Sequence, residues 1–281
     1  MEGAQLYVVE VGRPEGYPIV VLHGGPGLDH HEFADYLDPL ADRGYRLILA
    51  DQRASGRSPA CDPATWTLPR MAADVCDLAR SLGLVRYAVL GHSYGAFVAL
   101  QNAVDVPGAA AQTVVSGGMP SARFLETVDD NLAAFEPERL RTQVTESWAR
   151  EVDVRTQEDF ASLIHDQLPF HFADPLDPRI ADYERRSAAT VYAPDVLRAF
   201  AANEYGGIEV EDRLGEITQP VLVTTGRHDR TCTVAAAEAI AAGVPDAELV
   251  IFERSGHMTF VEEADAYLDA VDGFLRRRGA G

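Results

Sequence analysis

YAVLGHSYGAFVAL, residues 87–100, is the stretch that decides the fold of this 281-residue chain. Its first four residues form an apolar run that predicts a buried strand, and residues 96–100 predict the start of a buried helix. Between them lies Gly91-His92-Ser93-Tyr94-Gly95, a G-x-S-x-G motif. A serine in a tight turn between strand and helix is typical of a nucleophile elbow, which lifts the hydroxyl clear of the sheet. The stretch therefore predicts an α/β fold with Ser93 as a nucleophile.

The charge of the chain limits the classes of molecule that it is expected to bind. The formal net charge is −20, and nucleic acids or anionic membranes would repel such a surface, so neither is expected as a partner. All 24 basic residues are arginine, and the absence of lysine excludes a Schiff base, a pyridoxal-phosphate anchor and a phosphate-loop lysine. We expect a small-molecule or short-peptide substrate and no cofactor. The composition does not predict an oligomeric state.

The cysteines and the N-terminal residues indicate the cellular compartment in which the protein is expected. Cys61, Cys76 and Cys232 are an odd number without metal-ligand spacing, which indicates free thiols in a reducing environment. Residues 1–5 have neither the basic nor the apolar region of a signal peptide, and no apolar run is long enough to span a membrane. We therefore expect a cytoplasmic protein.

Short apolar runs alternate with amphipathic stretches along the chain, the pattern of a mostly parallel sheet flanked by helices. The expected strands are residues 17–22, 45–50, 87–90, 111–115, 221–225 and 249–252, with an earlier strand at 5–11 that pairs at one edge. Apolar residues at helical spacing predict helices at 71–82 and 261–275.

The alternation stops between residues 120 and 212. This stretch has no clear strand, and its expected helices are residues 122–135, 137–152 and 156–168. We expect residues 1–119 and 213–281 to form the core and residues 120–212 to form an inserted helical cap. Ligands of open α/β sheets bind at the carboxyl ends of the strands, the edge that the insertion leaves from, so a cap is favoured over a separate helical domain.

A serine hydroxyl needs a base to remove its proton, and the base needs an acid to orient it. In this fold class the order along the chain is Ser, then Asp or Glu, then His. Asp229 follows the strand 221–225, and His257 follows the strand 249–252. The predicted triad is therefore Ser93 as nucleophile, His257 as general base and Asp229 as its orienting acid.

Other titratable residues nearby fit these roles less well. His228 precedes Asp229, which is the wrong order for the base. Glu253 leaves the same strand as His257 and is too close to orient it, and Asp51 precedes the nucleophile.

An oxyanion needs two backbone donors. The amide of Tyr94 directly follows the nucleophile and is the first. His23-Gly24-Gly25-Pro26-Gly27 follows the first core strand, and Gly25 is assigned as the second donor because proline has no amide proton. The residues Asp29-His30-His31-Glu32 could suggest a metal site, but four adjacent residues rarely converge on one ion, so no metal is predicted. Arg53 and Arg57, after the next strand, are expected in ion pairs rather than in catalysis.

Five motifs resemble those of the α/β-hydrolase superfamily and, within it, the proline iminopeptidase-like group of serine peptidases. They are His23-Gly24-Gly25-Pro26-Gly27, Asp51-Gln52-Arg53, Gly91-His92-Ser93-Tyr94-Gly95, Gly226-Arg227-His228-Asp229 and Ser255-Gly256-His257. The resemblance implies an α/β-hydrolase fold with a helical cap and the triad Ser93, Asp229 and His257. It also implies removal of an N-terminal residue, often proline, from short peptides.

The resemblance also bears on substrate binding. Relatives of this kind bind the substrate's free amino group with acidic side chains, and Asn203-Glu204-Tyr205 resembles the cap segment that carries one of them, which implies Glu204. Some relatives have a second glutamate directly after the catalytic acid, where this chain has Arg230. A cation there would repel an ammonium group and favour a substrate carboxylate. Arg230 thus favours the alternative of an esterase, lactonase or amidase acting on a small carboxylic ester or amide.

Two alternatives lie outside hydrolysis. A non-catalytic receptor on the same fold is disfavoured because all three triad positions carry the required residue types. A lyase on the same scaffold stays open at this level, as does the question of whether Cys232, three residues after Asp229, reaches the pocket.

Overall fold

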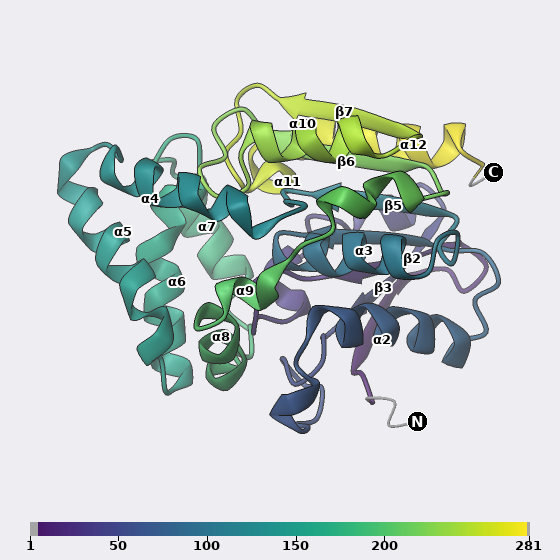
Figure 1. The fold of residues 1–281 in the computed structure, drawn as a ribbon, viewed down its shortest axis with the longest axis horizontal. Coiled ribbons are helices and arrows are strands. Elements are labelled where there is room, and N and C mark those ends of the chain that lie inside the picture. Colours follow the sequence, from purple (N-terminus) through teal and green to yellow (C-terminus); the bar gives the residue numbers. More distant parts are fainter. Residues whose placement is uncertain (1–4, 280–281) are drawn as a thin grey trace.

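The computed structural model describes residues 5–279, so Met1 to Ala4, on which the signal-peptide prediction rests, lie outside the described residues. Within this range, seven strands form one sheet in the order β1-β3-β2-β4-β5-β6-β7 (Figure 1). The strands are β1 (Val8–Gly12), β2 (Tyr17–Leu22), β3 (Tyr45–Ala50), β4 (Ala88–His92), β5 (Gln112–Ser116), β6 (Val221–Gly226) and β7 (Ala247–Phe252). β1 pairs antiparallel with β3 at the edge, and every other neighbouring pair is parallel. The predicted mostly parallel sheet is confirmed.

Helices cover both faces of the sheet because its central strands are apolar on both sides. Val20 and Leu22 of β2 pack on one face, and Ile19 and Val21 pack on the other. The first face is covered by α2 (Leu68–Ser81), α3 (Tyr94–Asp105) and α10 (Val234–Gly243). The second face is covered by α1 (Pro39–Asp42), α11 (Thr259–Glu262) and α12 (Ala264–Arg277). The helix expected at 261–275 is thus two helices. Among residues 5–279, none of the helices has the length and apolar character needed to cross a membrane.

Residues 120–212, called the insertion from here on, lie between β5 and β6. Their α-helices are α4 (Glu126–Ala133), α5 (Glu138–Arg150), α6 (Gln157–His171), α7 (Arg179–Arg186), α8 (Pro194–Ala201) and α9 (Glu204–Gly207). Three short 3-10 helices accompany them, η3 (Ala122–Leu125), η4 (Glu151–Asp153) and η5 (Glu211–Glu216), the last of which leads into β6. Figure 1 shows α4, α5, α6 and α8 gathered in teal and green at one end of the sheet.

Helix α6 is the longest element of the insertion and reaches the site with its C-terminal end. It starts at a capping box, in which the Thr156 hydroxyl accepts the Asp159 N–H at 3.0 Å and Asp159 Oδ2 accepts the Thr156 N–H at 2.9 Å. The helix continues through Pro169 to His171, three residues beyond the predicted end. Those added residues bring His171 beside the loop after β7, where its carbonyl accepts the His257 N–H at 2.6 Å.

The two ends of the insertion adjoin one another. Ser121 and Glu209 form an antiparallel bridge, and the Ser121 hydroxyl donates to Glu209 Oε2 at 2.8 Å. The Ala122 N–H donates to the Ile208 carbonyl, and the Val210 N–H donates to the Pro120 carbonyl. The insertion therefore leaves and rejoins the sheet at a single point.

Candidate active site

Ser93 lies at the junction of β4 and α3, in a turn that only glycine neighbours permit. A Cβ on Gly91 would lie 2.0 Å from the Gly95 carbonyl oxygen, and one on Gly95 would lie 2.2 Å from that of Leu22. Ser93 has φ 53° and ψ −120°, a strained conformation for a residue with a side chain. It is partly exposed while its neighbours on both sides are buried. The turn thus presents the hydroxyl, as expected of a nucleophile elbow.

Asp229 and His257 come together from the loops after β6 and β7. Asp229 Oδ2 and His257 Nδ1 are 2.7 Å apart, and both side chains are buried. The other carboxylate oxygen of Asp229 accepts the N–H of Thr231 at 2.9 Å, its hydroxyl at 2.8 Å and the N–H of Cys232 at 2.9 Å. These donors fix the carboxylate so that one oxygen is left for the imidazole.

Charge pairing sets the ionisation of this pair. Burial alone would lower the pKa of His257, but the Asp229 carboxylate outweighs it, so the pKa of His257 is raised. Burial would raise the pKa of Asp229, and the histidine and the donors around Thr231 lower it below its ordinary value. Asp229 is therefore a carboxylate at neutral pH and stabilises the imidazolium form of His257.

Two further imidazoles flank His257. The His92 ring centroid lies 4.8 Å from that of His257, and the His171 centroid lies 5.3 Å away. Burial lowers the pKa of His171 to about 3 and that of His92 well below its ordinary value. Both stay neutral at physiological pH, so they pack against His257 without competing for its proton.

The turn after β2 lines the same cavity as Ser93. Gly25 has φ 107°, which favours glycine, and both Gly25 and Tyr94 line the cavity that contains Ser93. Within residues 5–279 neither amide donates to a protein acceptor. The turn is held by Gln52, whose N–H donates to His23 Nε2 at 3.0 Å and whose side-chain amide donates to the His23 carbonyl at 2.5 Å.

Ser93 and His257 line one cavity of about 100 Å³ between the sheet and the insertion. Most of its wall is apolar. The apolar lining includes Leu28, Phe97, Met119, Leu125, Val128, Phe160, Leu163, Ile164, Leu168, Leu197 and Met258. Cys232 is buried and also lines the cavity, which answers the question of its position.

Glu151 is the polar group of the insertion that the sequence did not single out. It lines the cavity and is 6% exposed, and its carboxylate accepts the Gln167 side-chain N–H at 2.7 Å and the Tyr205 hydroxyl. Burial raises the pKa of Glu151 to about 7, against the effect of these two donors. Nothing in the local sequence distinguishes it from the many exposed glutamates of the chain.

Glu204 does not line this cavity, so the structure does not place it with Ser93 and His257. It is exposed and lines an outer groove with Arg123 and Glu126. Glu204 and Tyr205 both have positive φ, so the chain turns sharply there and brings the next side chain, Tyr205, into the cavity instead. The resembling segment thus reaches the site one residue later than expected.

Arg230, the other residue predicted to bind substrate, does not line the cavity either. Its guanidinium donates to the carbonyls of Phe170, Phe172 and Ala173 at 2.6–3.1 Å and lies over the Phe135 ring, 5.2 Å from its centroid. Burial lowers the pKa of Arg230, and neighbouring carboxylates oppose this effect. Arg230 binds the end of α6 to the core.

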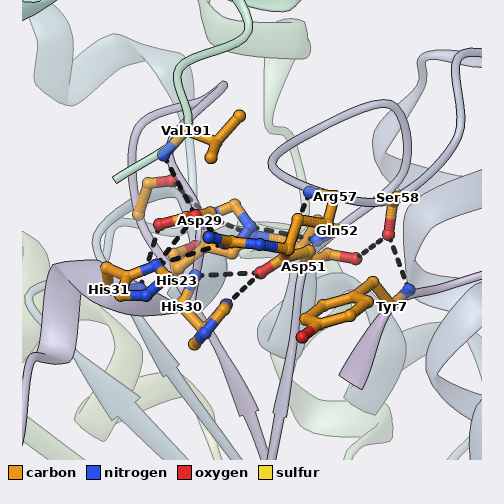
Figure 2. A network of polar contacts seen from close by, with 11 residues as sticks. Tyr7, His23, Asp29, His30, His31, Asp51, Gln52, Arg57, Ser58 and Val191 are labelled. Atoms are coloured by element: carbon orange, nitrogen blue, oxygen red, sulfur yellow. Dashed lines mark hydrogen bonds and ion pairs between the residues drawn. The ribbon is translucent and has the colours of Figure 1, made fainter. Parts of the chain in front are cut away.

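Asp29, His30 and His31 lie within a network of polar contacts (Figure 2). Asp29 accepts N–H groups of His31, Arg57 and Val191, and the His30 ring contacts Asp51 at 2.6 Å. One ligand atom from each of Asp29, His30 and His31 lies within 4.8 Å of the others, although adjacent residues were not expected to converge on one ion. The predicted ion pair of Arg57 is confirmed, at 3.1 Å from Asp29.

Arg53 lies apart from this network. It pairs with Asp74 through two hydrogen bonds of 2.6 and 2.8 Å, with both side chains buried. The predicted ion pair of Arg53 is confirmed as well.

Comparisons with known proteins agree with this architecture. The family model described as alpha/beta hydrolase fold matches residues 17–264. The chain is 32% identical to a proline iminopeptidase of Xanthomonas citri, over 96% of this chain and 92% of the relative. It is 26% identical to a proline iminopeptidase of Clostridium botulinum, over 92% of this chain and 90% of the relative.

Solved structures give the same fold. The proline iminopeptidase of Mycobacterium smegmatis superposes with a TM-score of 0.75 at 25% identity, covering 99% of this chain and 96% of that one. An esterase from Exiguobacterium antarcticum superposes with a TM-score of 0.76 at 22% identity, covering 98% and 97%. The chain is a serine hydrolase that belongs to the α/β-hydrolase family, in its proline iminopeptidase-like group.

Proposed function

We propose that this hydrolase is an aminopeptidase that removes the N-terminal residue of short peptides through an acyl-enzyme on Ser93. The observation that carries the proposal is Glu151, a buried carboxyl group in the wall of an otherwise mostly apolar cavity that also contains Ser93 and His257. Gln167 and Tyr205 donate to this carboxyl group but are neutral, so its charge stays uncompensated. A buried charge is costly without a counter-charge, and a substrate ammonium group would supply one. In this proposal the insertion is a cap that carries the selectivity.

The chemistry follows from the roles proposed for the triad. His257 Nε2 takes the proton of the Ser93 hydroxyl as its oxygen attacks the substrate carbonyl, and Asp229 stabilises the imidazolium that forms. The amides of Gly25 and Tyr94 donate to the oxyanion of the tetrahedral intermediate. His257 then returns the proton to the leaving amine, and the acyl-enzyme remains. A water molecule, deprotonated by His257, hydrolyses this ester and releases the N-terminal residue.

Selectivity for a free N-terminus is assigned to Glu151. Gln167 and Tyr205 donate to its two oxygens and hold the carboxyl group in place. A charge-assisted hydrogen bond to an ammonium group in this desolvated setting is about twice as strong as a neutral one. Peptides whose N-terminus is blocked lose this contact and bring an unpaired amide toward a buried acid.

A paired assay tests the proposal. We expect turnover of proline p-nitroanilide and at least a tenfold lower kcat/KM for its N-acetyl derivative, on the order of one lost charged hydrogen bond. p-Nitrophenyl butyrate is the reference substrate, because it needs the nucleophile but has no amino group. Equal kcat/KM for the free and acetylated anilides would contradict the proposal.

An esterase acting on small carboxylic esters is the second candidate. It is favoured by the apolar wall and by the pKa of Glu151 near 7, which leaves part of the population uncharged at neutral pH. Turnover of the butyrate ester without turnover of either anilide would support this candidate over the aminopeptidase.

A further inference from the structure

Glu32 is a second buried carboxyl group in the cavity, and neither the triad nor Glu151 accounts for it. It lies in η1 (His30–Phe33), the 3-10 helix that follows the turn after β2. Its side chain is 5% exposed and lines the cavity on the sheet side, together with Ser93 and His257.

The contacts of Glu32 tie it to the turn that carries Gly25. Glu32 Oε2 accepts the Gly24 N–H at 2.5 Å. A Cβ on Gly24 would lie 2.6 Å from Glu32 Oε1 and 2.9 Å from Ser93 Cβ, so the carboxyl group and the nucleophile approach Gly24 at the same point. No protein donor within residues 5–279 bonds to Oε1. The carboxyl group thus fixes the turn with one oxygen and has the other free beside Ser93.

The charge on this group acts at the place where the reaction builds negative charge. Three titratable groups face Glu32, namely His257 from the loop after β7, Tyr183 from α7 and Asp29 from its own turn. Burial raises the pKa of Glu32 to about 7, the Gly24 N–H and His257 oppose this effect, and Asp29 adds to it. Both forms of the carboxyl group are therefore populated around neutral pH.

We propose that Glu32 is a positioning residue of the hydrolytic reaction, which holds the Gly24–Gly25 turn against Ser93 and does so productively as the neutral acid. An ionised carboxylate at this point repels the oxyanion that the amides of Gly25 and Tyr94 are to stabilise. The neutral acid keeps the contact with Gly24 and removes that repulsion. The inference rests on the proposed role of Ser93 as nucleophile and is independent of whether the substrate is a peptide or an ester.

The pH dependence follows from the two groups. His257 must be neutral to act as the base, so the rate rises as pH increases through the pKa of His257. Glu32 must be protonated, so the rate falls as pH increases through its pKa near 7, by up to about tenfold per pH unit. The profile is a bell. Glu32 and His257 interact, so its two limbs belong to the pair, and replacing Glu32 shows whether the alkaline limb depends on it.

The test measures the rate at which a fluorophosphonate labels the protein between pH 5 and pH 9. In this reaction the Ser93 oxygen forms a bond to phosphorus, the P–F bond breaks, fluoride leaves and the serine proton passes to His257. We expect Glu32→Gln to label within about threefold of the wild-type rate at pH 6 and to lose the alkaline limb, because the amide still accepts from Gly24 and cannot ionise. Glu32→Ala should label about ten- to a hundredfold more slowly at pH 6, since the turn loses its anchor.

Glu262→Gln is the matched control. Glu262 also accepts backbone N–H groups, from Ala173 at 2.8 Å and Gly256 at 2.7 Å, and burial raises its pKa to about 7, but it does not line the cavity. The alkaline limb should persist in this variant. An alkaline limb that persists in Glu32→Gln, or a Glu32→Ala variant that labels at the wild-type rate, overturns the inference. Failure of the wild-type protein to label at all would instead refute the proposed role of Ser93.

Discussion

The cavity has two walls, and they are built in different ways. On the sheet side, polar groups are held by loops that follow parallel strands, and Asp229 alone accepts three hydrogen bonds besides its contact with His257. On the insertion side the wall is mainly leucine, isoleucine and aromatic side chains around the single carboxyl group of Glu151. The polar network of the first wall fixes the positions of individual atoms, whereas the second wall mainly defines volume.

This difference separates the reaction from the choice of substrate. The chemistry depends on the distances between polar atoms on the sheet side, which rigid strand ends supply. In the proposed function, the substrate depends on the size of the cavity and on the charge of Glu151. Both are supplied by helices of the insertion, which can differ between members of a fold while the sheet stays the same. Each wall can therefore be altered while the other reports on the result.

The largest effect is expected from Ser93→Ala on the sheet side. Without the nucleophile no acyl-enzyme forms, and kcat/KM for p-nitrophenyl butyrate should fall by about 10⁴-fold or more. The melting temperature should change little, because the Ser93 hydroxyl makes no hydrogen bond to any of residues 5–279. Hydrolysis near the wild-type rate would show that Ser93 is not the nucleophile.

A smaller and selective effect is expected from Glu151→Gln on the insertion side. kcat/KM for proline p-nitroanilide should fall by about ten- to a hundredfold, and that for the butyrate ester should change by less than threefold. Glu204→Gln is the control, since Glu204 is exposed in the outer groove. An equal fall in kcat/KM for both substrates on Glu151→Gln would contradict the role of Glu151 in selecting substrates with a free amino group.

The smallest effect on activity is expected from Arg230→Ala, at the junction of the two walls. Three carbonyls at the end of α6 lose their donor, which should lower the free energy of unfolding by about 1–3 kcal/mol, measured by urea denaturation. Turnover of the ester should fall by less than about tenfold. A large rise in KM confined to substrates that carry a carboxylate would instead place the guanidinium in the cavity.

The sequence predicted the sheet side well because its signals are local. β2 and β3 match their predicted bounds, since strands buried on both faces read as continuous apolar runs between turns. The sharp turn around Ser93 follows from two glycines whose hydrogen atoms face backbone carbonyls. Chain order and the position of each residue directly after a predicted strand selected Asp229 and His257, the pair that the fold brings within 2.7 Å.

The insertion side was predicted less well because its signals depend on how helices pack. Glu151 has no local mark, and only its burial between Gln167 and Tyr205 distinguishes it. Arg230 was read from its position next to Asp229, but the direction of a long side chain depends on where acceptors lie, and those acceptors come from α6, some 60 residues away. A local sequence pattern does not show that these distant residues lie next to the guanidinium of Arg230.

The junction of Ser121 with Glu209 gives the insertion a property of its own. Because the chain leaves and rejoins the sheet at one bridged pair, the two ends of the insertion lie side by side. An insertion of this kind can be shortened, lengthened or exchanged by recombination while the hydrogen bonds between β5 and β6 persist. We expect grafts joined at this bridge to fold on the present sheet, which makes it the natural crossover point for building chimaeric enzymes.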